Sequence, residues 1–112
     1  MVGAVAVETM VDAGVIHSLA VVEPMRRRGI GGALVIAARK AAHTRGARRL
    51  YALDGDGIGY LDRFGFERVT PSEMIDDLAG TFIAGYIGSR PEAFAQLAAM
   101  RLDISRDGVI ER

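Results

Sequence analysis

The chain has no cysteine, no net formal charge and no long apolar run, and each absence excludes a class of function. Without cysteine there is no disulfide scaffold, no zinc–thiolate site and no cysteine nucleophile. The 14 basic and 14 acidic residues cancel, so no global field attracts nucleic acid or an anionic membrane, and any anion site must be local. No basic stretch typical of a signal peptide precedes residue 15, and no apolar run reaches membrane-spanning length. We therefore expect a cytoplasmic protein that binds neither nucleic acid nor membrane.

Length and composition favour a single domain. The chain has 112 residues, of which 50% are hydrophobic. That is enough for one compact core but too little for two independent ones. The sequence contains no internal repeat and no low-complexity linker. We expect one domain over residues 1–112.

The first half of the sequence predicts a hairpin followed by a helix. Residues 2–11 and 15–22 are rich in Val, Ile and Ala, and residues 12–14 between them have turn chemistry. From Ile30 to Arg45, apolar residues recur at helical spacing, and Gly46 is a good helix stop. The hairpin and this helix come before the other predicted strands in the sequence.

The second half predicts shorter elements. Thr70-Pro71-Ser72-Glu73 has the capping-box pattern, which opens a helix through about Leu78. A second box at residues 89–92 precedes an expected helix over residues 93–97, and residues 105–112 read as a frayed tail. The remaining predictions are a strand over 49–53, a short helix over 58–64 ended by Gly65, and strands over 66–69 and 98–104. This order predicts an α/β (α+β) fold, with a mixed, mostly antiparallel sheet and flanking helices.

Arg26-Arg27-Arg28-Gly29-Ile30-Gly31-Gly32 lies between the second strand of the hairpin and the helix. Glycines let the main chain approach a ligand closely, and the first amides of a helix have no partner inside it. The helix dipole and the three arginines add positive charge at the same place, which suits a polyphosphate ligand. Two other phosphate loops do not fit: no lysine follows the glycines until Lys40, and Leu34 stands where the dinucleotide fingerprint needs a small residue.

Arg26-Arg27-Arg28-Gly29-Ile30-Gly31 resembles the Q/R-x-x-G-x-G/A signature of the GNAT superfamily of N-acetyltransferases. The segment Tyr60–Phe66 is similar to the aromatic-x-x-x-x-G-F segment of that family, and the resemblance covers roughly residues 3–69. Within the superfamily the sequence is most similar to the arsenic-resistance-associated amino-acid acetyltransferases, in residues 14–21 and 48–53. The resemblance implies a GNAT-like acyl-CoA N-acyltransferase fold that moves an acetyl group from acetyl-CoA to a primary amine of a small molecule, such as an amino acid, without a metal.

The resemblance also implies which residues hold the coenzyme. The amides at the start of the helix bind the diphosphate, while the end of the second strand pairs with the pantetheine arm as if it were another strand. That strand is expected to splay from the strand over 49–53, so that an edge amide polarises the acetyl carbonyl. The residues assigned to the coenzyme are Leu19, Ala20, Val21, Arg26, Arg27, Arg28, Gly29, Ile30, Gly31 and Gly32.

Transfer to an amine needs a general base and a general acid. If Asp12-Ala13 forms a two-residue hairpin loop, Glu8 lies directly across from His17, and the pair could act as base. A three-residue loop would pair Glu8 with Ser18 instead, because a one-residue slip moves side chains to the other face. A structural hydrogen-bonded pair, or two unrelated exposed residues, are the alternatives to catalysis.

Many family members use a tyrosine in the aromatic segment as the acid, and here Leu61 holds that position. Tyr60 stands one residue earlier, about 100° away on an α-helix, and is the candidate acid. Core packing by an aromatic residue is the alternative role for Tyr60.

The usual family fold begins with a strand and two helices that wall the acceptor cleft, and we expect this sequence to start at the hairpin after them. Either a second subunit supplies that wall, or the segment from Thr70 to Leu97 covers the exposed sheet edge, or the protein binds the coenzyme without transferring its acetyl group. Unpaired sheet edges attract partners, so a homodimer is expected. A catalytically silent acetyl-CoA-binding or sensing module is the alternative function, and a structural domain without a ligand is the third hypothesis.

Overall fold

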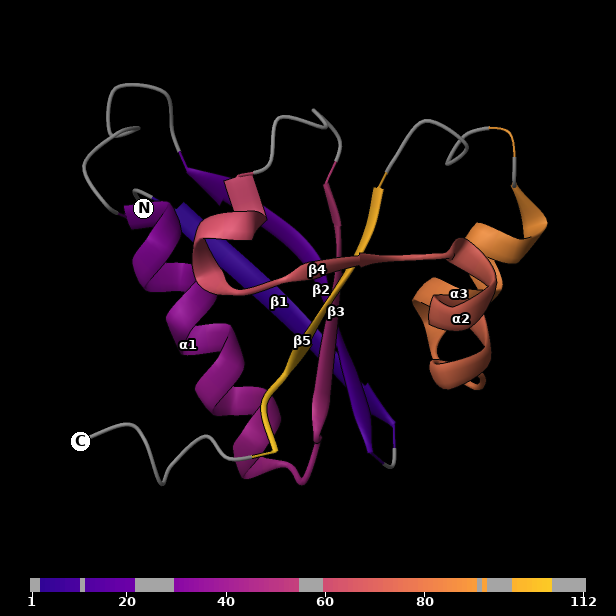
Figure 1. The fold of residues 1–112 in the computed structure, drawn as a ribbon, viewed down its shortest axis with the longest axis horizontal. Coiled ribbons are helices and arrows are strands. Elements are labelled where there is room, and N and C mark those ends of the chain that lie inside the picture. Colours follow the sequence, from indigo (N-terminus) through magenta and orange to yellow (C-terminus); the bar gives the residue numbers. More distant parts are fainter. Residues whose placement is uncertain are drawn as a thin grey trace.

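The computed structural model describes residues 3–10, 12–21, 30–54, 60–90, 92 and 98–105. These residues form strands, α-helices and one 3-10 helix, labelled in Figure 1. In chain order they are β1 (Gly3–Met10), β2 (Ala13–Val21), α1 (Ile30–Thr44), β3 (Arg49–Asp54), η2 (Tyr60–Phe64), β4 (Glu67–Val69), α2 (Pro71–Asp77), α3 (Phe82–Ser89) and β5 (Ala98–Asp103).

The strands form one five-stranded sheet in the order β1-β2-β3-β5-β4. Among the described strands only β2 and β3 are parallel, and β5 lies between β3 and β4 and is antiparallel to both. Helix α1 connects β2 to β3, because two parallel strands need a crossover connection, which is usually a helix. The predicted fold class, a mixed and mostly antiparallel sheet with flanking helices, is confirmed.

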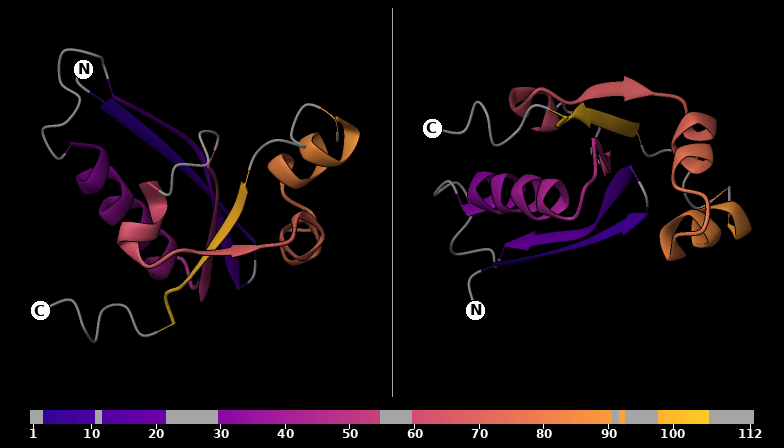
Figure 2. Two further views of the ribbon diagram at one scale, coloured as in Figure 1. Left: turned by 45° about the horizontal axis from the view of Figure 1, so that its top comes forward. Right: turned by 90° about the horizontal axis from the view of Figure 1, so that it is seen from below.

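The sheet curves around α1 (Figure 2). In the right view of Figure 2, β1 and β2 lie on one side of α1, and β4 and β5 lie on the other. Helices α2 and α3 lie outside the curve. The inner core joins Val35, Ala38 and Ala42 of the helix to Leu50 and Ala52 of β3. These side chains are spaced three or four residues apart in α1 and two apart in β3, the periodicities of a helix and a strand that share one core.

The outer face of the sheet has its own apolar core. Tyr51 of β3 points to this side, between Leu50 and Ala52, and is only 1% exposed. Met74 and Leu78 of α2 cover it, together with α3. Burying an aromatic or aliphatic side chain of this size contributes roughly 1.5 to 3 kcal/mol, so these contacts hold the two helices on the sheet. The residues of this outer core are Ala13, Val15, Tyr51, Met74, Leu78, Ala84, Ile87 and Ala99.

Local sequence signals predicted most of these elements. The helix expected over Ile30–Arg45 is α1, and the capping box at Thr70 is present in full: its hydroxyl accepts from the Glu73 amide at 3.1 Å, and the Glu73 carboxylate accepts from the Thr70 amide at 3.3 Å. The short helix over 58–64 is the 3-10 helix η2, and Gly65 follows it with a positive φ of 92°. The strand over 98–104 is β5.

Two features differ from the sequence expectation. Helix α3 was not expected, because its apolar residues do not follow one stripe and it contains two glycines. Ser89, expected to open a helix as the first residue of the second capping box, instead ends α3, and its hydroxyl donates to the Tyr86 carbonyl at 2.9 Å. The helix expected over 93–97 and the tail beyond Ser105 lie outside the described residues. No helix in the described part of the chain is long and apolar enough to cross a membrane.

Candidate active site

Two strands that start as neighbours separate along their length. Strands β2 and β3 are paired from Ala13 to Val15 on one and from Arg49 to Tyr51 on the other. Beyond these pairs β2 runs on to Val21 and β3 to Asp54, and the described residues of the two strands have no further partners in each other. Figure 1 shows their carboxyl ends diverging. We call this region the strand opening; it leaves main-chain groups of β2 from residue 16 onward without a sheet partner on the β3 side.

The predicted coenzyme residues fall partly inside the described structure. Leu19, Ala20 and Val21 lie at the diverging end of β2, where they pair with residues 5, 4 and 3 of β1 on their other side. Ile30, Gly31 and Gly32 form the first turn of α1. Arg26, Arg27, Arg28 and Gly29 lie outside the described residues.

Gly32 has a packing role that the sequence did not predict. A Cβ atom at this position would lie 3.2 Å from Cζ of Phe64, a contact tighter than side chains usually tolerate. The ring of Phe64, at the end of η2, therefore rests against the first turn of α1. Close approach of a ligand is not the only use of a glycine at this turn.

The predicted pairing of Glu8 with His17 is wrong. The hairpin turns one residue earlier than expected, so Met10 pairs with Ala13 and Glu8 pairs with Val15. The register then shifts between Ala6 and Val7, which leaves His17 as the extra residue of a β-bulge without a Cα partner. The side chain of His17 lies outside the described part of the structure.

Glu8 instead contacts helix α3. Its two carboxylate oxygens accept hydrogen bonds from the amides of Phe82 at 2.7 Å and Ile83 at 3.3 Å. These amides belong to the first turn of the helix and have no acceptor within it. A carboxylate at this end also interacts favourably with the helix dipole. Glu8 therefore joins the edge strand β1 to α3.

The expected acid position is part of the core. Leu61 is 4% exposed and packs with the side chains between α1 and the sheet. Tyr60 is the first residue of η2, and its side chain lies outside the described structure.

Sequence reasoning missed a polar cluster between β3 and α2. Asp77 of α2 accepts two hydrogen bonds from the Arg49 guanidinium, one from Nε to Oδ2 and one of 2.9 Å from Nη2 to Oδ1. The Tyr51 hydroxyl donates to the same carboxylate at 2.6 Å. No local signal indicates this cluster, because 28 residues separate Arg49 from Asp77.

The cluster shifts the proton affinities of its members. Hydrogen bonding to Arg49 holds the pKa of Asp77 below its ordinary value, and hydrogen bonding to Asp77 raises the pKa of Arg49. Burial, and then the neighbouring Asp77, raises the pKa of Tyr51. A hydrogen bond with the Tyr51 hydroxyl raises the pKa of Arg101 on β5. At neutral pH the cluster holds a charged Asp77 and a neutral Tyr51.

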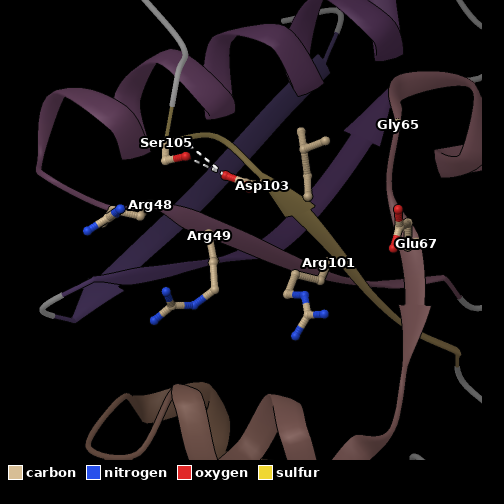
Figure 3. Close-up of a pocket in the computed structure, with 8 residues that line it drawn as sticks. Arg48, Arg49, Gly65, Glu67, Arg101, Asp103 and Ser105 are labelled. Atoms are coloured by element: carbon tan, nitrogen blue, oxygen red, sulfur yellow. Dashed lines mark hydrogen bonds between the residues drawn. The ribbon is translucent and has the colours of Figure 1, made fainter.

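A cavity of about 520 Å³ lies beside this cluster, at the end of β3 away from the strand opening. Figure 3 shows the side chains of Arg49 and Arg101 extending from neighbouring strands toward the same side, and Asp103 accepting hydrogen bonds from Ser105. Two of the arginines that line the cavity have acidic partners within the protein: Asp77 binds Arg49, and Glu73 lies 3.6 Å from Arg101. The lining residues are Arg48, Arg49, Gly65, Glu67, Arg101, Leu102, Asp103 and Ser105. Within the described ranges, no group of three His, Asp or Glu side chains could hold a metal ion.

Solved structures of several proteins resemble this fold. The Mycobacterium tuberculosis protein Rv2747, in complex with CoA and NLQ, has a TM-score of 0.74 at 22% identity, covering 91% of this chain and 67% of that one. N-acetylglutamate synthase from Neisseria gonorrhoeae, complexed with coenzyme A and N-acetyl-glutamate, has a TM-score of 0.72 at 23% identity, covering 91% of this chain. This chain spans 23% of the synthase. Ard1 from Thermoplasma volcanium has a TM-score of 0.63 at 16% identity, covering 91% of this chain and 62% of that one.

The sequence itself places the chain in a family. No curated protein matches it. The profile of the acetyltransferase (GNAT) family matches residues 1–66, more than half of the chain and the part that contains the strand opening and α1. With a parallel strand pair that separates beside a glycine-containing helix start, the chain belongs to the acetyltransferase (GNAT) family.

Proposed function

We propose that this protein is an acetyl-CoA-dependent N-acetyltransferase that acetylates a primary amine of a small molecule, such as an amino acid. Family membership supports an acyl-CoA-dependent transferase. The names of two similar structures mention coenzyme A, and one of them is N-acetylglutamate synthase. We propose that acetyl is the transferred group and that a small amine is the acceptor. We also propose that residues 1–112 form a single domain.

The strand opening is the observation that carries the proposal. Main-chain groups of β2 from Ile16 to Val21 face away from β1 at alternate positions, and β3 does not pair with them. An extended pantetheine arm can take that place, as an added strand does at a sheet edge. The amides of Ile30, Gly31 and Gly32 open α1 at the same end of the sheet and suit the coenzyme's diphosphate.

The reaction follows from this placement. The amine nitrogen attacks the carbonyl carbon of the thioester, the carbon–nitrogen bond forms, and the carbon–sulfur bond breaks. A general base takes the proton from the nitrogen, and an acid protonates the leaving thiolate to give free coenzyme A. An unpaired amide of β2 in the opening stabilises the negative oxygen between these steps, a contribution of about 3 kcal/mol for one well-aimed donor. Tyr60 and His17 remain our candidates for acid and base.

The proposal is tested by binding and by turnover. We expect acetyl-CoA to raise the melting temperature, because a ligand that binds only the folded state stabilises it. Gly31→Val should remove this shift, since a branched side chain at the first turn of α1 blocks the approach of the diphosphate. Release of free thiol with a panel of amino acids, polyamines and peptides then identifies the acceptor. Absence of any heat with coenzyme A in calorimetry would refute the proposal.

A catalytically silent acyl-CoA-binding module is the second candidate. Two observations favour it: the position expected for the acid holds the buried Leu61, and the carboxylate of Glu8 is bound to α3. Such a module would bind coenzyme A with the same thermal shift but release no thiol with any amine. The same pair of assays therefore separates the two functions.

A homodimer is also proposed. Strand β1 is an outer strand of the sheet and spans eight residues, with β2 on one side. Long outer strands tend to pair with another chain. Light scattering coupled to gel filtration measures the mass of the particle, and a monomer at all concentrations would contradict this proposal.

A further inference from the structure

One row of residues crosses the outer face of all five strands. In register, Glu8 pairs with Val15, Val15 with Tyr51, Tyr51 with Arg101, and Arg101 with Glu67. Paired residues of neighbouring strands point to the same face of a sheet. Val15 and Tyr51 are also the last pair between β2 and β3. The row therefore marks the closed end of the strand opening.

Helices α2 and α3 are fastened along this row. Glu8, at one end, accepts from the first amides of α3. Tyr51, in the middle, donates to Asp77 of α2, and Arg101 lies 3.6 Å from Glu73 of the same helix. Between these polar contacts the apolar side chains of both helices cover Val15 and Tyr51. The helices thus stand at the base of the opening, on the face opposite to α1.

The coenzyme would approach the strand opening from the inner face of the sheet. In the proposed function the diphosphate lies at the start of α1 on that face, and the pantetheine arm enters the opening from there. The thioester at the end of the arm then faces the outer side, where α2 and α3 are. An amine that attacks the thioester from the outer side passes along these helices.

We propose that α2 and α3 form the acceptor-side wall of the strand opening, and that Glu8 and Asp77 are the positioning residues that hold this wall. The inference rests on the proposed function. It gives Glu8 a different role from a general base: both of its carboxylate oxygens are bound by amides at the start of a helix, which stabilise the charged form and leave it anchored.

The experiment compares Glu8→Gln and Asp77→Asn with the unmodified chain. Asp76→Asn is the matched control, because Asp76 is the exposed neighbour of Asp77 on α2 and its side chain lacks the Arg49 and Tyr51 contacts. Three quantities are measured: the Kd for coenzyme A by calorimetry, amide hydrogen exchange over residues 71–89, and thiol release from acetyl-CoA. Thiol release is followed with water alone, which gives acetate and free coenzyme A, and with each L-amino acid that supports transfer.

We expect an unchanged Kd, faster exchange in α2 and α3, and a rate of acetyl-CoA hydrolysis raised at least about threefold, because a loosened wall admits water to the thioester. For an accepted amino acid, KM should rise about tenfold while kcat changes less than about threefold, since a displaced wall weakens acceptor binding more than the chemical step. Asp76→Asn should behave as the unmodified chain does.

Two results would overturn the inference. Faster exchange in α2 and α3 with unchanged hydrolysis and unchanged KM would mean that the helices only cover the sheet. A large loss of kcat in Glu8→Gln with unchanged exchange would mean that Glu8 is the base. Failure of the proposed function is a separate result, in which the unmodified chain does not bind coenzyme A.

Discussion

The Tyr51 hydroxyl donates a 2.6 Å hydrogen bond to Asp77 Oδ2 and so joins the middle of the sheet to α2. Tyr51→Phe keeps the buried ring and removes the hydroxyl, with its hydrogen bonds to Asp77 and Arg101. We expect the free energy of unfolding to fall by at least about 1 kcal/mol, the usual net contribution of one hydrogen bond. Urea denaturation measures it. In Asp77→Asn the same substitution should have a smaller effect, and equal effects in both backgrounds would mean that the two groups do not interact.

The stability of the protein should depend on pH through Asp77. Its pKa is lower in the folded chain than its ordinary value of 3.8, so the unfolded chain binds the proton more tightly. The stabilisation by the charged Asp77 is therefore complete at a pH above the ordinary pKa, and it is lost as the pH falls through the pKa of the folded chain. We expect the difference in unfolding free energy between the unmodified chain and Asp77→Asn to shrink as the pH is lowered from 7 to about 2. A constant difference over that range would contradict the assignment.

The capping box of α2 gives a prediction on local stability. Thr70→Ala removes the hydroxyl that accepts from the Glu73 amide, and loss of such a cap costs about 1 kcal/mol. Ser72→Ala is the control, because Ser72 is exposed in the same turn and does not cap the helix. Thermal unfolding should separate the two variants, and similar melting temperatures would argue against the cap.

Gly32→Ala tests the contact between α1 and η2. The added methyl group would lie 3.2 Å from Phe64, so the ring must move by a few tenths of an ångström. Alanine also favours the helical conformation by about 1 kcal/mol over glycine. We expect the unfolding free energy to fall, because the contact with the ring outweighs this gain in helix propensity. A higher unfolding free energy would show that η2 moves without cost.

Local patterns explain why much of the fold was predictable. The helix α1 has apolar residues at the spacing of one helical face, and α2 begins with a complete capping box between Thr70 and Glu73. Both signals lie within one segment of sequence. The strand predicted over residues 49–53 alternates between two buried faces, with Leu50 on one and Tyr51 on the other.

Features that depend on distant residues were not predictable. The observed hairpin register differs from the predicted one in the position of the turn and in the bulge at His17. Either difference moves a side chain to the other face of the sheet. Helix α3 depends on Glu8, 74 residues away from Phe82, for acceptors of its first amides. The cluster around Asp77 likewise joins residues that only the folded chain brings together. The assignments of His17, Tyr60 and the coenzyme residues to their chemical roles remain predictions, and so does the positioning role proposed for Glu8.

The place of β5 in the sheet has a consequence for biosynthesis. This strand lies between β3 and β4, yet it follows both of them and two helices along the chain. While residues 98–103 are still inside the ribosome, β3 has an exposed edge and β4 has not met the strand to which it binds. The sheet is then completed by insertion of a late segment between two earlier ones, so a nascent chain of this protein stays open to chaperones and proteases until synthesis has passed Asp103.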